Sequence, residues 1–199
     1  MIDISNICNE EPYVEFLKFY EKAIEKKQES IEAVSISSFN NTENEVDSRY
    51  VNLKYINKNE WIFFTNYSSP KAIQFLKHDQ IAASFYWPKA NVQIRIKAKI
   101  FKTDEIFSDK HFVSRSVHKN ALAISSEQSM EISSYEKVVE NFNNQLSRSN
   151  EMLSRPSNWG GFSFKPYYFE FWEGAKSRLN KRVCYKLSNT HWEKKYLQP

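Results

Sequence analysis

Cationic side chains recur in this sequence beside aromatic ones, and this combination could bind a flat, anionic ligand. The clearest case is FEFWEGAKSRLNKRVCY, residues 169–185, in which Trp172 precedes four Lys or Arg residues within a few positions. Aromatic rings can stack on a ring system, and cations can pair with its acidic groups. Gln93, which lies between apolar residues, and Gln128 could exchange hydrogen bonds with carbonyl groups of a heterocycle. A solvated basic strand, which needs no ligand, is the alternative.

Another group of cationic or titratable residues is spaced at helical intervals. His111, Arg115 and Lys119 lie four residues apart and would share one face if a single helix covered them all. For this segment alone, an exposed basic stripe is the simpler interpretation. Cations on other segments favour a ligand instead, and these are Arg49, Lys54, Lys71, Arg178 and Arg182.

Lys71 is in an unusual place for a cation. It follows Ser69 and Pro70, which are typical of an N-cap and a first helical position. The helix dipole favours anions at that end. A bound phosphate would resolve the mismatch, with the hydroxyl groups of Thr65 or Ser69 as further donors. Otherwise, Lys71 simply points to water.

Several kinds of site are excluded by residue types and spacing. The three glycines cannot form a dinucleotide-binding GxGxxG or a phosphate-binding GxxxxGK[ST] motif. The four histidines form no HExxH or His/Cys cluster, and no serine lies in a GxSxG motif, so we expect no metal site and no catalytic triad. Two isolated cysteines, the lack of a signal-peptide pattern and the lack of a long apolar run predict a cytoplasmic protein without a membrane partner.

The composition is that of an ordinary globular protein, but its charge is unevenly distributed. Of the 199 residues, 41% are hydrophobic and 26% charged, with a net charge of +4. Residues 1–48 carry eleven Asp or Glu against four Lys or Arg, whereas residues 171–199 carry seven Lys or Arg against two Glu. A basic C-terminal region is compatible with nucleic acid, a membrane surface or an anionic small molecule.

Hydrophobic periodicity predicts the elements that must position these residues. Helices are expected after Pro12, within an N-terminal helical segment of residues 1–30, after caps at Ser69 and Thr103, and from near Ser134. Strands are expected at residues 31–39, 49–56, 61–66, 80–87 and 92–101 and in several segments after residue 159, with a polar loop at 40–48. Short turns between strands predict an antiparallel sheet closed into a barrel. No linker interrupts the chain, so we expect a single domain over residues 1–199.

A series of segments resembles pyridoxamine (pyridoxine) 5′-phosphate oxidases in sequence and in order: SRYVNLK, IFFTNYSSPKA, FYWPKANVQIRI, HFVSR, SSEQS, RPSNWGGF, EFWEGAKSRLNKR and the closing WEKKYLQP. The resemblance runs from about residue 10 to the C-terminus. It implies a mainly β (α+β) fold, namely a split antiparallel β-barrel of the FMN-binding type with flanking helices. It also implies a homodimer with FMN at its interface.

The resemblance also assigns roles to individual residues. The positions that match the FMN site are Arg49, Phe64, Thr65, Lys71, Gln93, Gln128, Ser129, Trp172 and Arg182. Arg49 and Lys71 would hold the FMN phosphate, and some of the set would reach across from the partner subunit. The positions that match the substrate site are Lys54, His111, Arg115, Lys119, Arg178 and Asn180. Arg178 and Asn180 would be catalytic, since they would frame the substrate ring and its reacting carbon.

This chain departs from the family's usual pattern at several of these positions. Pro70 stands where an arginine is usual, Asn180 where a histidine is usual, His111 where a tyrosine is usual and Lys119 where a serine is usual. The stretch ALAI also replaces IGAW. Lys119 adds a full positive charge, so we expect the ligand to remain anionic. The change at Asn180 leaves the identity of the oxidised group open.

The implied activity is that of an FMN-dependent oxidase in vitamin B6 metabolism. Such an enzyme converts pyridoxamine or pyridoxine 5′-phosphate to pyridoxal 5′-phosphate, with hydride transfer to the flavin and reduction of dioxygen to hydrogen peroxide. One alternative is an oxidase of the same fold for another aromatic anion, as in the phenazine pathway. A second is a protein that binds flavin or a B6 phosphate without turnover. Nucleic-acid binding is not expected, because the basic positions match small-ligand sites better.

Overall fold

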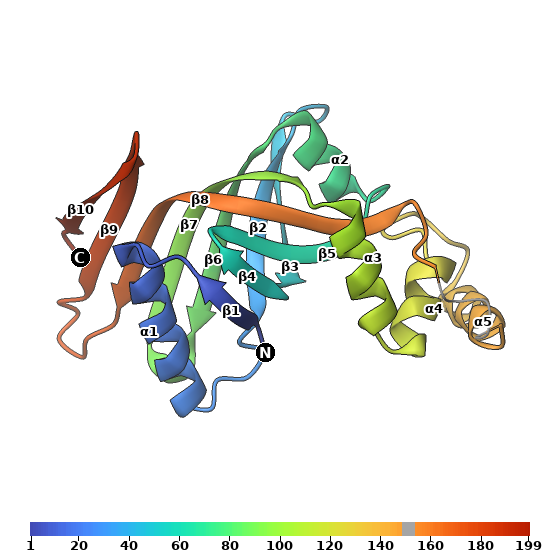
Figure 1. Ribbon diagram of the computed structural model, residues 1–199, viewed down its shortest axis with the longest axis horizontal. Helices are drawn as coiled ribbons and strands as arrows, with labels where there is room; N and C mark the ends of the chain where they lie inside the picture. The colour runs from blue at the N-terminus through green and yellow to red at the C-terminus, as the bar shows by residue number, and fades with distance from the viewer. Residues whose placement is uncertain (149–153) are drawn as a thin grey trace.

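A single ten-stranded sheet forms the body of the protein in the computed structural model, in which residues 1–148 and 154–199 are described (Figure 1). Its strands run in the order β1-β4-β5-β8-β7-β6-β2-β3, and the β9–β10 hairpin joins through β9 to β8. The strands are β1 (Asp3–Ile7), β2 (Ala33–Asn40), β3 (Glu45–Asn52), β4 (Tyr55–Lys58), β5 (Glu60–Asn66), β6 (Gln80–Trp87), β7 (Val92–Lys102), β8 (Trp159–Glu173), β9 (Lys181–Ser188) and β10 (His191–Leu197).

The helices lie around the sheet in separate places. They are α1 (Glu11–Glu25), α2 (Pro70–Lys77), the short 3₁₀ helix η1 (Pro88–Ala90), α3 (Glu105–Ser114), α4 (Val117–Ser125) and α5 (Tyr135–Leu146). In Figure 1, α3, α4 and α5 gather at one end of the long axis, and the β9–β10 hairpin lies at the other. No helix within the described residues has the length and apolar character needed to span a membrane.

The hydrophobic core is built largely from aromatic rings between α1 and the sheet. Phe16 on α1 is fully buried, and its ring centroid lies 4.5 Å from that of Trp61 and 5.7 Å from that of Phe85. Strand β7 contributes the alternating buried residues that its sequence predicts, namely Val92, Ile94, Ile96, Ala98 and Ile100. Burial of one stripe of α1 and one face of β7 fixes how the helix and the sheet pack.

The expected fold class is confirmed, with two differences in the sheet. Most neighbouring strands are antiparallel, but β1 pairs with β4 in parallel, and no sequence pattern predicted β1. Among the described strands no pairing joins β3 to β1, so the expectation of a closed barrel is wrong. Whether residues 1–199 form one domain stays a prediction.

Two predicted strand boundaries are wrong near the candidate site. Residues 40–48 do not form a loop throughout, because β3 begins at Glu45 and pairs with β2 in a hairpin. The strand predicted for residues 49–56 is interrupted after Asn52, so that Lys54 lies between β3 and β4. The hairpin extends the strand backwards because each residue gains a partner across the turn, which the polar sequence does not reveal.

Helix boundaries follow the capping residues in part. Ser69 is the N-cap of α2 as predicted, and α5 begins near Ser134 as predicted, with Ser134 as its N-cap. The cap of α3 is Asp104 rather than Thr103, and its carboxylate accepts a hydrogen bond from the backbone N–H of Phe107 at 3.0 Å. The helix ends at Ser114, and α4 is a separate element that the sequence analysis missed.

We predict that Phe16→Ala lowers the free energy of unfolding by roughly 3–5 kcal/mol, because it leaves a cavity among packed rings. Val14→Ala on the exposed side of α1, where Val14 is 51% exposed, is the matched control and should change it by less than about 0.5 kcal/mol. Urea denaturation followed by circular dichroism measures both. Equal effects of the two substitutions would contradict the assigned core.

Candidate functional site

A buried ammonium group lies at the start of α2. Lys71 is only 8% exposed, and its Nζ donates to Thr65 Oγ1 at 3.3 Å and to Ser69 Oγ at 3.4 Å. No carboxylate among the described residues forms an ion pair with it. Burial, together with the nearby charge of Arg49, lowers the pKa of Lys71 to about 8. A charge in such surroundings is costly, so this place suits an anionic ligand.

Arg49 on β3 adds a second positive charge beside Lys71. Its Nη1 donates to Ser38 Oγ at 2.6 Å, and its Nη2 donates to Gln74 Oε1 at 3.1 Å. The carboxylate of Asp47 is 3.7 Å from the same Nη2, so Arg49 has one acidic neighbour. Burial lowers the pKa of Arg49 and outweighs the opposite effect of Asp47.

Gln128, in the segment between α4 and α5, closes this region. Its Oε1 accepts from Thr65 Oγ1 at 2.7 Å and from the backbone N–H of Asn66 at 3.3 Å. The neighbouring Ser129 has φ 70°, in the left-handed region, which marks a sharp change of chain direction. Together these contacts bring residues from three separate parts of the sequence to the end of β5.

A group of stacked rings lies next to these polar residues. The ring of Phe64 is 3.8 Å from that of His111, with 14° between their planes, and 5.3 Å from that of Trp159. Nδ1 of His111 is 2.8 Å from the hydroxyl oxygen of Tyr55. Burial, followed by the charges of Arg115, Lys54 and Lys119, lowers the pKa of His111 to about 4. His111 is therefore a neutral ring at pH 7 and adds no charge to the site.

Contacts between α3 and β8 hold His111 over Phe64. The backbone N–H of Gly161 donates to Ser108 Oγ at 3.1 Å, which joins the middle of α3 to the start of β8. A Cβ at Gly161 would lie 2.5 Å from Thr103 Oγ1 and 3.1 Å from the ring of Phe64. Glycine at this position therefore permits the close approach of the helix to the sheet.

Arg115 and Lys119 meet although no single helix carries them with His111. The chain turns between α3 and α4, so the expectation of one shared helix face is wrong. Nη2 of Arg115 donates to the backbone oxygen of Lys119 at 2.8 Å, and the guanidinium lies 4.3 Å from the ring centroid of Trp159. Burial lowers the pKa of Arg115 to about 10, and its Nη1 is buried and has no hydrogen-bond partner among the residues that the structure describes. An orphaned donor of this kind fits a ligand oxygen.

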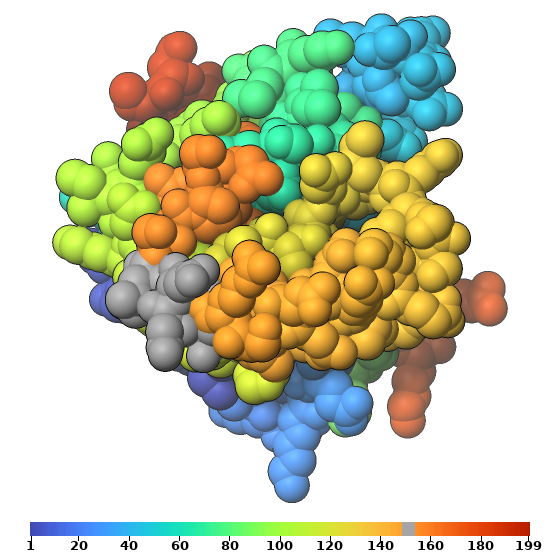
Figure 2. Space-filling model, turned by 90° about the vertical axis from the view of Figure 1, so that its right-hand side faces the viewer, coloured from blue at the N-terminus to red at the C-terminus, as the bar shows by residue number. Residues whose placement is uncertain are grey.

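One pocket of about 190 Å³ lies among these groups, and we call it the anion pocket; Lys71 and Arg49 do not line it, but Lys71 donates to Thr65, which does. It is lined by Phe64, Thr65, Asn66, Arg115, Lys119, Leu122, Ala123, Ser126, Gln128 and Trp159. Figure 2 shows the molecule from this end, with α5 toward the viewer in yellow and orange. Residues at predicted cofactor positions and residues at predicted substrate positions thus lie side by side.

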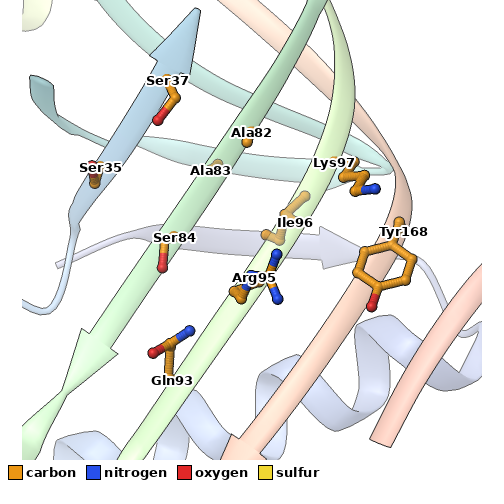
Figure 3. A pocket seen from close by; sticks show the side chains of 10 residues that line it. All are labelled: Ser35, Ser37, Ala82, Ala83, Ser84, Gln93, Arg95, Ile96, Lys97 and Tyr168. Atoms are coloured by element: carbon orange, nitrogen blue, oxygen red, sulfur yellow. The ribbon is translucent and has the colours of Figure 1, made fainter. Parts of the chain in front are cut away.

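A second group of predicted residues lies on another part of the sheet, and we call it the β7–β9 row. Gln93 on β7 is paired with Trp172 on β8, which is paired with Arg182 on β9. Residues paired across neighbouring strands project from the same face of a sheet. Gln93 also lines a groove of about 230 Å³ together with residues of β2, β6 and β8 (Figure 3).

Arg178 and Asn180 lie in the connection between β8 and β9. Arg178 is exposed and has φ 61°, in the left-handed region. The side-chain oxygen of Asn180 accepts from the backbone N–H of Ala175 at 3.0 Å, which ties the loop together. This loop and the β7–β9 row are neighbours along the chain, and neither contributes to the lining of the anion pocket.

The anion pocket and the β7–β9 row do not meet within one chain. Thr65 is paired with Gly160 near the start of β8, whereas Trp172 lies near its end. The intervening strand is on the order of 40 Å long when extended. Figure 1 shows the same separation, with α3–α5 at one end of the molecule and β9 at the other.

Sequence analysis missed several residues that complete these two groups. Tyr55 contacts His111, Gln74 contacts Arg49, and Glu170 contacts Arg182. Glu170 had a weak signal, because it is the single acid among the apolar residues of YYFEFW. The other two are polar residues on a strand and a helix, and only the pairing of distant segments reveals their contacts.

Comparison with known proteins identifies relatives along almost the whole chain. A pyridoxine/pyridoxamine 5′-phosphate oxidase of Actinobacillus succinogenes is 34% identical over 192 residues, which cover 96% of this chain and 91% of that protein. Pyridoxine/pyridoxamine 5′-phosphate oxidase 1 of Hydrogenovibrio crunogenus is 34% identical over 176 residues, which cover 88% of this chain and 81% of that protein. The family described as pyridoxine 5′-phosphate oxidase C-terminal dimerisation region matches residues 159–199.

Solved structures share the fold. PhzG of Burkholderia lata, in complex with tetrahydrophenazine-1-carboxylic acid, superposes with a TM-score of 0.89 at 24% identity and covers 95% of this chain and 93% of its own. A pyridoxamine 5′-phosphate oxidase-related, FMN-binding protein of Nostoc punctiforme superposes with a TM-score of 0.77 at 12% identity. The match covers 94% of this chain and 96% of that protein. By its sequence relatives, this chain belongs to the pyridoxine/pyridoxamine 5′-phosphate oxidase family of FMN-dependent oxidoreductases.

Proposed function

We propose that this protein is a homodimeric, FMN-dependent oxidase that converts pyridoxamine or pyridoxine 5′-phosphate to pyridoxal 5′-phosphate. The anion pocket is the observation that carries the proposal. Cations without a carboxylate partner line it, and Phe64, Thr65 and Gln128 line the same cavity at positions that match the flavin site of the family. Family relatives that carry this enzyme's name support the reaction.

The residues at the start of α2 fit the phosphate of FMN. Lys71 is a buried cation with only hydroxyl partners, and Arg49 supplies a second charge beside it. Phosphate oxygens would replace the missing counter-charge and could also accept from Thr65 and Ser69. Pro70 leaves this cluster without the further arginine that is usual in the family. We therefore propose that Lys71 and Arg49 carry most of the phosphate binding.

A second anion would be held by Arg115 and Lys119, with Lys54 nearby. The unpartnered Nη1 of Arg115 is a ready donor to an oxygen of the substrate phosphate. His111 is neutral and would act as a packed ring with hydrogen-bonding capacity rather than as a charge. The lysine at position 119 makes this group more positive than a serine would, which favours a doubly charged phosphate ester.

The remaining work of the protein is positioning. When bound, FMN supplies a hydride acceptor and returns the electrons to dioxygen, which gives hydrogen peroxide. Phe64 and Trp159 would exclude water from one side of the site, and Arg115 would fix the phosphate end of the substrate. Arg178 and Asn180 would orient the substrate ring at its reacting carbon.

A second copy of the chain is needed to bring these groups together. Arg178 and Arg182 lie far from the anion pocket in their own chain, at the other end of β8. Residues 159–199, which contain both arginines, match a region described in the family as a dimerisation region. We propose that the β7–β9 row of one subunit completes the anion pocket of the other, as in a twofold dimer.

An oxidase of the same fold for another aromatic anion is the second candidate. PhzG, whose fold this chain shares, is described in complex with a phenazine carboxylic acid. His111, Lys119 and Asn180 all differ from the residues usual in the B6 enzymes, so the substrate end of the site is where the two candidates differ. A protein that holds flavin without turnover is the remaining outcome to be tested.

The direct test is spectroscopic. Purified protein mixed with FMN should retain the flavin and elute as a dimer in gel filtration. Anaerobic addition of pyridoxamine 5′-phosphate should bleach the flavin absorption, and air should restore it with release of hydrogen peroxide. Bleaching by aromatic carboxylic acids alone would favour the second candidate. Retained flavin that no candidate substrate bleaches would indicate a binding protein.

Lys71→Met should stabilise the protein without FMN and weaken FMN binding. Below about pH 8, Lys71 is charged in the folded and the unfolded chain, so the folded state bears the full cost of burying the charge. Removing that charge should raise the free energy of unfolding by on the order of 2 kcal/mol at pH 7. The gain should shrink as pH rises from about 8 towards 10.5, the range in which folded Lys71 loses its proton first.

Thermal unfolding with and without FMN measures both effects. Lys77→Met at the exposed end of the same helix is the control, and it should alter stability by no more than about 0.5 kcal/mol. A Lys71→Met variant that is less stable without FMN, or that binds FMN as tightly as the original chain, would contradict the assignment of Lys71.

A mixture of two inactive variants tests the shared site. Arg115→Ala and Arg178→Ala should each lose at least about tenfold in oxidase activity as homodimers. Co-expressed in equal amounts, they should recover about a quarter of the original activity, because half of the dimers are mixed and each contains one intact site. A mixture no more active than the separate variants would place both arginines in the same subunit's site.

A further inference from the structure

Glu170 is a buried carboxylate next to the β7–β9 row. It is 3% exposed and lies on β8, two residues from Trp172 and on the same face. Its Oε1 accepts from Nε of Arg182 at 3.1 Å and from Nη2 of Arg182 at 2.7 Å. Its Oε2 accepts from Nη1 of Arg95 at 2.9 Å and from the hydroxyl of Tyr168 at 3.0 Å.

This carboxylate remains ionised despite its burial. Burial raises the pKa of Glu170. The hydrogen bonds from Arg182 and Tyr168 and the charges of Arg95 and Arg182 lower this pKa by more than burial raises it, so the net shift is downward. Two arginines thus share one carboxylate, and the cluster keeps one uncompensated positive charge.

The strand register places Glu170 and Arg95 next to the β7–β9 row, on the same face of the sheet. Arg95 is paired with Glu170, and the next pair along the same face is Gln93 with Trp172. Figure 3 shows Gln93 and Arg95 along β7, with Tyr168 beside them on β8. Every partner of Glu170 therefore comes from the strands that carry the predicted flavin residues.

The contacts also determine which donors of Arg182 stay available. A guanidinium has five N–H groups. In Arg182, Nε and one N–H of Nη2 are bound to Glu170, and one N–H of Nη1 is bound to the backbone oxygen of Gln198 at 2.8 Å. Two N–H groups remain, one on each terminal nitrogen, and Glu170 fixes the plane in which they lie.

We propose that Glu170 is a positioning residue for the cofactor, which holds the guanidinium of Arg182 beside Trp172 so that its two free N–H groups face FMN. The inference rests on the proposed function, since it takes FMN as the ligand of the β7–β9 row. Glu170 itself touches no cofactor. It acts through Arg182, and its negative charge also offsets one of the two positive charges of Arg95 and Arg182.

The test is the affinity for FMN, measured by quenching of flavin fluorescence. Glu170→Gln should weaken FMN binding by roughly tenfold, because Arg182 loses its charged partner and its fixed orientation. Glu173→Gln is the matched control: it removes a carboxylate that pairs with Lys22, three residues along the same strand but on the opposite face. The control should bind FMN within about twofold of the original chain.

A double-mutant cycle shows whether Glu170 acts through Arg182. In an Arg182→Ala background, Glu170→Gln should weaken FMN binding by less than about twofold. An equal loss in both backgrounds would refute the positioning role, as would unchanged affinity in the single variant.

Glu170→Asp covers the case in which the glutamine variant fails to fold. This variant keeps the charge but moves it back by one methylene group. If both variants fold, the FMN affinity of Glu170→Asp should lie between those of the original chain and Glu170→Gln. If only Glu170→Asp folds, its FMN affinity should be roughly threefold or more below that of the original chain. Original affinity in a folded Asp variant would overturn the inference. Failure of the unaltered chain to bind FMN would instead overturn the proposed function, so the two failures are distinguishable.

Discussion

Positive charge held away from water, with too little negative charge around it, is the constraint on which this structure depends. Burying a charge costs free energy unless an opposite charge or several dipoles replace the lost water. Among the described residues, Lys71 has only hydroxyl oxygens as partners, and Arg49 has a hydroxyl, an amide, the backbone oxygen of Ile36 and one more distant carboxylate. The excess charge lies where β3, β5 and α2 converge, and Gln128 links the segment before α5 to the same place.

The contrast between the two ends of β8 shows how differently charge can be buried. Glu170 is surrounded by donors that satisfy both of its oxygens, so it is stable without any ligand. Arg115 keeps a buried nitrogen without a partner. One end of the strand therefore holds a carboxylate whose oxygens are both satisfied, and the other holds a donor that is not. This difference would suit the proposed site of two chains, in which a preformed surface on one subunit docks against an unsatisfied one on the other.

Sequence patterns predicted those parts of the fold that local chemistry determines. The alternation along β7 and the Ser69–Pro70 start of α2 are encoded in neighbouring residues, and both are confirmed. Strand β1 was missed because Asp3–Ile7 forms a strand only by pairing with β4, and the break after Ser114 separates residues whose spacing suggests one helix. The contacts of Tyr55 and Glu170 are likewise long-range. The roles of the candidate residues came from family resemblance and stay predictions.

The single strand β8 connects the two ends of the molecule. Its fifteen residues run from Trp159, which lines the anion pocket, to Glu173, just beyond Trp172, with one irregularity in the pairing with β7 at Tyr167. A slip of the whole strand by one residue would turn Glu170 and Trp172 to the opposite face and would displace Gly160 and Gly161 from their partners on β5 in the same step. An error in the alignment of this one strand during folding would thus misplace the residues at both ends of β8 at once. A substitution at one end could not restore the residues at the other.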